Sequence, residues 1–163
     1  LQIWAITVNR GNQSRPRPER CKDSISNEGD FRVMSSFKDG KVKNLGKVFA
    51  GGTPKTENAA YYGKGHYWLP SGRVQNTILT LPKEGEAQIT DLGLKESSAK
   101  LIKPNSVLVA ITGSTCSNVA LLKFEATANQ SVVAIEPNSN VDSNYLFYGM
   151  LNLKDEIIKN FIF

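Results

Sequence analysis

The chain has 163 residues, 40% of them hydrophobic, which allows one domain with its own core but is short for two. Its formal charge of +5, from 20 Lys and Arg against 15 Asp and Glu, favours a polyanionic partner without identifying one. No apolar run approaches the roughly 20 residues that span a bilayer, and no signal-peptide pattern opens the chain. We therefore expect a cytoplasmic protein with no membrane partner.

The beginning of the chain differs in composition from the rest. Residues 9–30 contain two Arg-Pro steps and few apolar side chains, so they cannot bury enough surface to fold by themselves. We predict a flexible extension over residues 1–36, a folded domain over 37–153, and the end of a C-terminal helix over 154–163 that could begin a helical spacer. The extension is either a remnant of a preceding segment, which we favour, or a basic arm along DNA phosphates.

Short elements follow one another from residue 37 onward. Residues 42–50 form an amphipathic lead-in, and Thr90 or Asp91 could cap one helical turn that Gly93 should break. A helix should begin after Asp142 or Ser143, where apolar residues recur at helical spacing. The predicted fold is α/β (α+β): many short strands in a mixed, partly curled sheet, with a few short helices and a C-terminal helix. Strands are expected at residues 77–81, 106–111, 119–124 and 131–135.

Two glycines and a Thr-Pro step mark a sharp turn at residues 51–54, ahead of an aromatic run over residues 61–71. Glycine tolerates positive φ, whereas proline fixes φ and lacks a donor, so we expect this turn to present loops to a ligand.

Signatures of catalysis are missing from the sequence. His66 is the one histidine, and Cys21 and Cys116 are far apart, so neither a histidine metal triad nor a zinc knuckle is indicated. No phosphate-binding glycine loop, nucleophile elbow or dinucleotide fingerprint is present. Asp39 and Lys41 have an acid-x-Lys spacing, but no second acid accompanies them as a nuclease needs. The chain is expected to be non-catalytic, with no cofactor and no metal of its own.

Several loops carry polar side chains that suit either a ligand or a solvated turn. Residues 112–118 form a row of small hydroxyl and amide side chains, which could face a ligand or satisfy nearby backbone groups. Residues 73–76 combine a guanidinium with two amides, a set that can read base edges or remain solvated. Asn129 and Gln130 open the next strand with the same ambiguity. Single lysines could meet phosphate, although most surface lysines are only solvated: Lys55, Lys64, Lys95 and Lys100.

In this order, the segments resemble the target-recognition domain of type I restriction-modification specificity subunits. The resemblance covers about residues 44–153 in six blocks, each weak alone. One departure is Cys116-Ser117-Asn118, where the family often has Ile-Gly-Lys. The blocks are Gly51-Gly52-Thr53-Pro54, Tyr61-Tyr62-Gly63, Trp68-Leu69-Pro70-Ser71, the run from Ile89 to Leu101, Pro104 to Leu108, and the run from Thr112 through Leu121 with Asn129-Gln130.

The resemblance implies recognition of double-stranded DNA, with the domain reading one half of a split target. Methyltransferase subunits and, through them, a restriction subunit would be its protein partners, and S-adenosylmethionine, Mg²⁺ and ATP would belong to those partners. A carbohydrate- or protein-binding β-rich domain, docking its ligand on the aromatic run, is the alternative. The candidate DNA-binding residues are Lys55, Lys64, His66, Arg73, Gln75, Asn76, Ser114, Thr115, Ser117, Asn118, Asn129 and Gln130.

Overall fold

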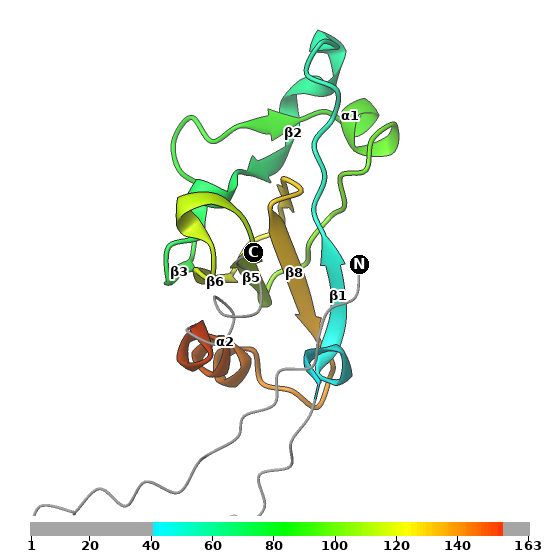
Figure 1. Ribbon diagram of the computed structural model, residues 1–163. Helices are drawn as coiled ribbons and strands as arrows, with labels where there is room; N and C mark the ends of the chain where they lie inside the picture. Colours follow the sequence, from blue (N-terminus) through cyan, green and yellow to red (C-terminus); the bar gives the residue numbers. More distant parts are fainter. Residues whose placement is uncertain (1–40, 155–163) are drawn as a thin grey trace, which may run out of the picture.

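The computed structural model describes residues 41–154, in which short strands alternate with short helices (Figure 1). The predicted extension and residues 155–163 lie outside this range. The strands are β1 (Gly46–Ala50), β2 (Tyr62–Leu69), β3 (Thr77–Leu79), β4 (Gln88–Ile89), β5 (Ser106–Ala110), β6 (Val119–Leu122), β7 (Thr127–Ala128) and β8 (Val132–Pro137). The helices are α1 (Asp91–Lys95) and α2 (Ser143–Asn152), with 3-10 turns η1 (Val42–Asn44), η2 (Ala59–Tyr61), η3 (Ser71–Arg73) and η4 (Gly113–Thr115).

Within residues 41–154 the strands form two mixed sheets. The larger has five strands in the order β1-β8-β5-β6-β3, antiparallel except where β3 pairs with β6. The smaller has the order β4-β2-β7, with β2 and β7 parallel. The predicted mixed α/β fold with a C-terminal helix is therefore confirmed, and its strands divide between two sheets. Figure 1 shows the small sheet and α1 at the opposite end of the molecule from α2.

Each face of the large sheet packs on a different partner. Leu146, Phe147 and Met150 of α2 pack on one face, with Val107, Val109 and Leu121 among their neighbours. Side chains of the small sheet and nearby segments, such as Leu69 and Ile102, pack on the other. Because both faces are covered, all five residues of β5 are buried, which explains its uninterrupted apolar sequence.

Both helices begin at side-chain caps that the sequence predicts. Thr90 Oγ1 accepts the Gly93 N–H at 3.1 Å, and Asp142 Oδ1 accepts the Tyr145 N–H at 2.7 Å. The expectation that Gly93 breaks the first helix is wrong, because α1 continues to Lys95. Gly93 is instead buried against the backbone of Tyr61, where a Cβ would overlap the carbonyl oxygen. Within the described range, no helix is long and apolar enough to cross a membrane.

Candidate nucleic-acid interface

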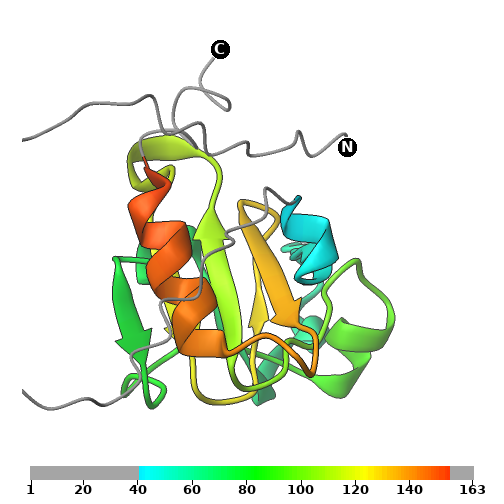
Figure 2. The same ribbon diagram turned by 90° about the horizontal axis from the view of Figure 1, so that it is seen from below.

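Five chain segments meet at one end of the large sheet. The register pairs Ala50 with Val133, Ala110 with Val132, and Val109 with Val119, and it sets Thr77 beside Ala120. The end of β1, the start of β8, the end of β5, the start of β6 and the start of β3 therefore lie at the same end. Figure 2 shows η4 and the C-terminal end of α2 there as well. We call this region the loop end.

Eight of the twelve candidate residues belong to segments that adjoin the loop end. They come from the segment before β3, the β5–β6 connection and the segment before β8, which are distant in sequence. They are Gln75, Asn76, Ser114, Thr115, Ser117, Asn118, Asn129 and Gln130. Lys55 lies in the exposed segment between β1 and β2, Lys64 and His66 are on β2, and Arg73 ends η3.

A hydrogen-bonded chain of side chains links three of these segments. Asn76 Nδ2 donates to Asn118 Oδ1 at 3.1 Å, and Lys154 Nζ donates to the same oxygen at 3.1 Å. Asn76 Oδ1 accepts the Val119 N–H at 3.0 Å, and Asn76 itself has φ of 55°, a left-handed conformation that asparagine tolerates. The segment before β3, the β5–β6 connection and the end of α2 are thus held together.

The other candidates at the loop end differ in accessibility. Ser114 and Gln130 are exposed, and Gln130 Oε1 accepts a hydrogen bond from the Thr53 hydroxyl. Asn129 uses its side-chain oxygen locally, accepting the Ser131 N–H at 3.1 Å. Ser117 is fully buried with φ of 70°, and its Oγ has no hydrogen-bond partner among the described residues. Its side chain therefore does not reach the surface, which corrects its place among the candidates.

Arg73 does not extend freely into solvent as the loop composition suggested. Its Nε lies 2.8 Å from Oε2 and 3.2 Å from Oε1 of Glu86, and the two side chains are 13% and 5% exposed. Glu86 Oε2 also accepts the Lys83 N–H at 3.1 Å. The guanidinium thus fixes the segment between β3 and β4 onto η3, while Gln75 remains exposed and donates to the Gly72 carbonyl at 2.8 Å.

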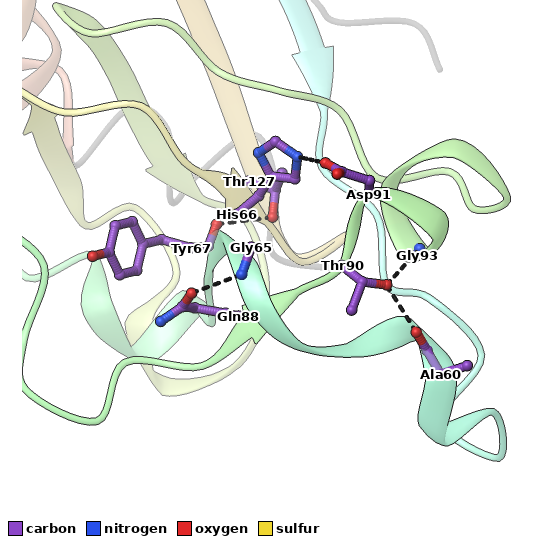
Figure 3. Close-up of polar contacts among 9 residues, drawn as sticks. All are labelled: Ala60, Gly65, His66, Tyr67, Gln88, Thr90, Asp91, Gly93 and Thr127. Carbon is purple, nitrogen blue, oxygen red and sulfur yellow. Dashed lines mark hydrogen bonds and ion pairs between the residues drawn. The ribbon is translucent and has the colours of Figure 1, made fainter.

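His66 points from β2 toward the start of α1, as Figure 3 shows. Its Nε2 lies 2.8 Å from Asp91 Oδ1, and the side chains are 24% and 97% exposed. A pair this exposed contributes little to stability because water screens it. Beside it, Gln88 Oε1 accepts the Gly65 N–H at 2.9 Å, and Thr90 Oγ1 donates to the Ala60 carbonyl at 2.8 Å.

The sequence motifs with glycines and aromatics build the scaffold behind these surfaces. Neither Gly51 nor Gly52 has positive φ, so these positions do not depend on the tolerance of glycine for that conformation. A Cβ on Gly51 would overlap the backbone of residues 128 and 129, and one on Gly52 would overlap Ser98. Glycine is needed there for close backbone approach. Trp68 Nε1 donates to the Gly52 carbonyl at 3.1 Å, which anchors β2 on this segment.

The aromatic residues of the run are bound to the scaffold, with Tyr61 buried and Tyr62, Tyr67 and Trp68 partly exposed. Tyr61 is buried, and its hydroxyl donates to Glu96 Oε2 at 2.9 Å. This hydrogen bond is the main reason why the pKa of Tyr61 is raised above its usual value; burial and the Glu96 charge add to it, and Asn58 opposes it. Tyr62 donates to the Pro54 carbonyl at 2.7 Å, and Tyr67 packs edge-on against Phe124. The alternative of carbohydrate or protein docking on this run is not supported.

Residues 34–163 match the family model of the type I restriction modification DNA specificity domain. The chain belongs to this family. Two specificity subunits are similar in sequence. The specificity subunit of the type I restriction enzyme EcoR124I/EcoR124II of Escherichia coli is 30% identical over 134 residues, which cover 77% of this chain. The specificity subunit of the type I restriction enzyme MjaIX of Methanocaldococcus jannaschii is 31% identical over 108 residues, which cover 66% of this chain. The chain spans 33% and 25% of the lengths of these two subunits.

Two solved structures have a similar fold. The HsdS subunit from Thermoanaerobacter tengcongensis superposes with a TM-score of 0.56 at 14% identity, over 78% of this chain and 31% of that one. A chain solved to explain complex assembly and conformational transition of the type I R-M system gives 0.53 at 13% identity, over 77% and 31%.

Two features of this specificity domain are not predicted by its sequence. Lys154 is linked to the β5–β6 connection, and the signal for this was only a lysine following an amphipathic helix. Gln88 was missed because the two-residue strand β4 has no periodicity to detect. Within residues 41–154, no group of three or more His, Cys, Asp or Glu is placed to hold a metal ion.

Proposed function

We propose that this specificity domain reads a DNA sequence as one target-recognition domain of a type I restriction-modification specificity subunit. It recognises one half of a split target and directs methyltransferase subunits, and through them a restriction subunit, to that site. The chain itself is non-catalytic, and the chemistry with its S-adenosylmethionine, Mg²⁺ and ATP belongs to the partners.

One observation carries the proposal beyond family membership: amide and hydroxyl side chains from three distant segments gather at the loop end. Gln75, Ser114 and Gln130 are exposed there. Side-chain amides donate and accept at once, which suits the paired donor and acceptor that adenine presents in the major groove. A rigid sheet beneath the loops supports discrimination because it keeps such groups at fixed spacing.

Accessibility decides the roles within the candidate set. Gln75, Gln130 and Ser114 are assigned to base edges or to groups near them, because their side chains are exposed at the loop end. The exposed lysines Lys55 and Lys64 are assigned to phosphates, which position the protein without reading sequence. The buried Ser117 and the ion-paired Arg73 are assigned to the scaffold.

The proposal is tested with the full-length protein that contains this chain, assembled with its methyltransferase partners. Binding is titrated on a duplex that the complex methylates and on one of equal length that it does not, across a range of salt. We expect preference for the first duplex and a steep fall in affinity with salt. Absence of preference, or an affinity independent of salt, would contradict the proposal.

A matched pair of substitutions tests the location of the reading surface. Gln130→Ala removes an exposed amide at the loop end, and each good bidentate base contact is worth about 1–3 kcal/mol of discrimination. Gln88→Ala removes an amide from the small sheet, where it bonds to the Gly65 backbone. We expect only Gln130→Ala to reduce the preference for the duplex that the complex methylates.

A further inference from the structure

Two lysine ammonium groups share one aromatic ring at the edge of the large sheet. Lys47 Nζ lies 5.1 Å from the centre of the Phe49 ring, and Lys100 Nζ lies 5.6 Å from the same centre. Both distances fall within the range in which a cation is attracted to the face of a ring. Two positive charges are therefore held beside one side chain.

Backbone geometry explains why these residues meet. Lys47 and Phe49 are two residues apart in β1 and so project from the same face of the sheet. Gly52, just beyond β1, lies against the backbone of Ser98, which brings the segment that carries Lys100 beside this strand. Phe49 is half-buried and packs against the core, so its ring is fixed while both lysines are exposed.

The two lysines of this cluster are not held in ion pairs within the described part of the chain. Neither Lys47 nor Lys100 forms an ion pair among residues 41–154. Glu136 stands opposite Lys47 in the ladder between β1 and β8, and its Oε1 accepts the Lys103 N–H at 3.4 Å, so its charge offsets part of the Lys47 charge and leaves the cluster with a net positive charge. Two like charges beside one ring repel each other, and an anion that binds at this edge of the sheet would relieve part of this repulsion.

The cluster lies on the same strand that leads to the loop end. From Phe49 the chain continues through Gly51 and Gly52 to Thr53, whose hydroxyl bonds to Gln130. A ligand that contacts Gln130 therefore passes close to β1. DNA carries one phosphate charge per 3.4 Å of each strand, so a duplex seated on the loops supplies successive anions along this edge.

The geometry points to a phosphate-binding patch formed by Lys47, Phe49 and Lys100, which holds the DNA backbone beside the base-reading loops. This assignment rests on the proposed function. The patch contributes affinity and orientation, not base preference, because ammonium groups at a ring recognise charge rather than base edges. Phe49 keeps the two ammonium groups in place, so less side-chain entropy is lost when a phosphate binds.

The test compares single substitutions that each remove one charge and keep an unbranched side chain: Lys47→Met, Lys100→Met and the control Lys83→Met. Lys83 follows β3, which forms the edge of the large sheet opposite β1. Binding of the assembled complex is measured across salt on the duplex that the complex methylates and on the one that it does not. For Lys47→Met and Lys100→Met we expect log–log salt slopes shallower by about 0.9 each, with equal loss on both duplexes.

Two further variants test separately the positive charge and the aromatic ring of the patch. Lys100→Arg should retain the wild-type slope, because a guanidinium also stacks on a ring and pairs with phosphate. Phe49→Leu keeps an apolar side chain in the core but removes the ring, and we expect affinity to fall about two- to fivefold. Circular dichroism melting of each variant checks that the fold is retained.

The outcomes separate the patch from the proposed function. If the wild-type complex prefers its duplex while Lys47→Met and Lys100→Met keep its salt slope, the patch is wrong and the proposed function stands. A loss of affinity confined to the duplex that the complex methylates also overturns the patch, since it indicates base reading. If the wild-type complex does not bind DNA, both proposals fail.

Discussion

Arg73 and Glu86 form a nearly buried ion pair that joins η3 to the segment before β4, with Nε 2.8 Å from Oε2. An arginine in a polar loop is a natural candidate for reading guanine, yet here its guanidinium is held by a carboxylate that is itself only 5% exposed. The contact makes Arg73 part of the support for its neighbours Gln75 and Asn76.

Substitution of Arg73 should therefore affect stability before it affects DNA reading. Arg73→Ala leaves the Glu86 carboxylate buried without its partner, and we expect the free energy of unfolding to fall by about 2–4 kcal/mol. Urea denaturation of the full chain measures this. Gln75→Ala, two residues away and exposed, is the matched control and should change stability by less than about 0.5 kcal/mol.

Asn76 combines an unusual backbone conformation with two side-chain hydrogen bonds, which two substitutions can separate. Asn76→Gly accepts φ of 55° freely but loses the bonds to Val119 and Asn118, whereas Asn76→Ala also strains the backbone. We expect losses of about 1 kcal/mol for glycine and about 2 kcal/mol for alanine in urea denaturation. Equal losses would mean that the left-handed conformation costs alanine nothing.

Gly52 should not tolerate even the smallest side chain. A Cβ there would overlap the Ser98 carbonyl group, and the Gly52 carbonyl must also stay in place to accept Trp68 Nε1–H. We expect Gly52→Ala to cost at least about 1–3 kcal/mol through overpacking. Gly72→Ala is the control, because nothing lies within 4 Å of a Cβ at that position. Thermal melting of the two variants compares them directly.

Tyr61 makes part of the folding stability sensitive to alkaline pH, where that part is lost. Its hydrogen bond to Glu96 raises the pKa of the phenol in the folded chain above the value of about 10 in the unfolded chain. The protonated form is favoured by folding, so this contribution is complete below about pH 10 and is lost as pH rises through the folded pKa. We expect Tyr61→Phe to show a smaller decline in unfolding midpoint above pH 10 than wild type.

An ultraviolet titration of tyrosine ionisation provides the matching readout for Tyr61. Glu96→Gln should lower the pKa of Tyr61 toward its ordinary value, because it replaces the carboxylate that accepts the phenol hydrogen bond and whose negative charge opposes the phenolate. An unchanged late-titrating tyrosine in Glu96→Gln would show that another group sets this pKa.

Local pattern predicted much of the fold. Strand β5 was expected at residues 106–111 and lies at Ser106–Ala110, since a run of apolar β-formers needs burial on both faces. The caps Thr90 and Asp142 follow from side-chain oxygens placed just before helical segments. By contrast, the sequence predicts no strand over residues 62–69, because the placement of β2 depends on contacts with the distant residues Gly52, Pro54 and Phe124.

By itself, the sequence determined the family, the mixed α/β class, the main strands of the large sheet and the start of both helices, because these depend on short-range periodicity, caps and ordered motifs. Tertiary structure alone decided which polar side chains remain available. Ser117 is buried, Arg73 is paired with Glu86, and Lys47 meets Lys100 at Phe49. The physical reason is that sheet register and close backbone approach set contacts between residues far apart in sequence, and no local pattern records those contacts.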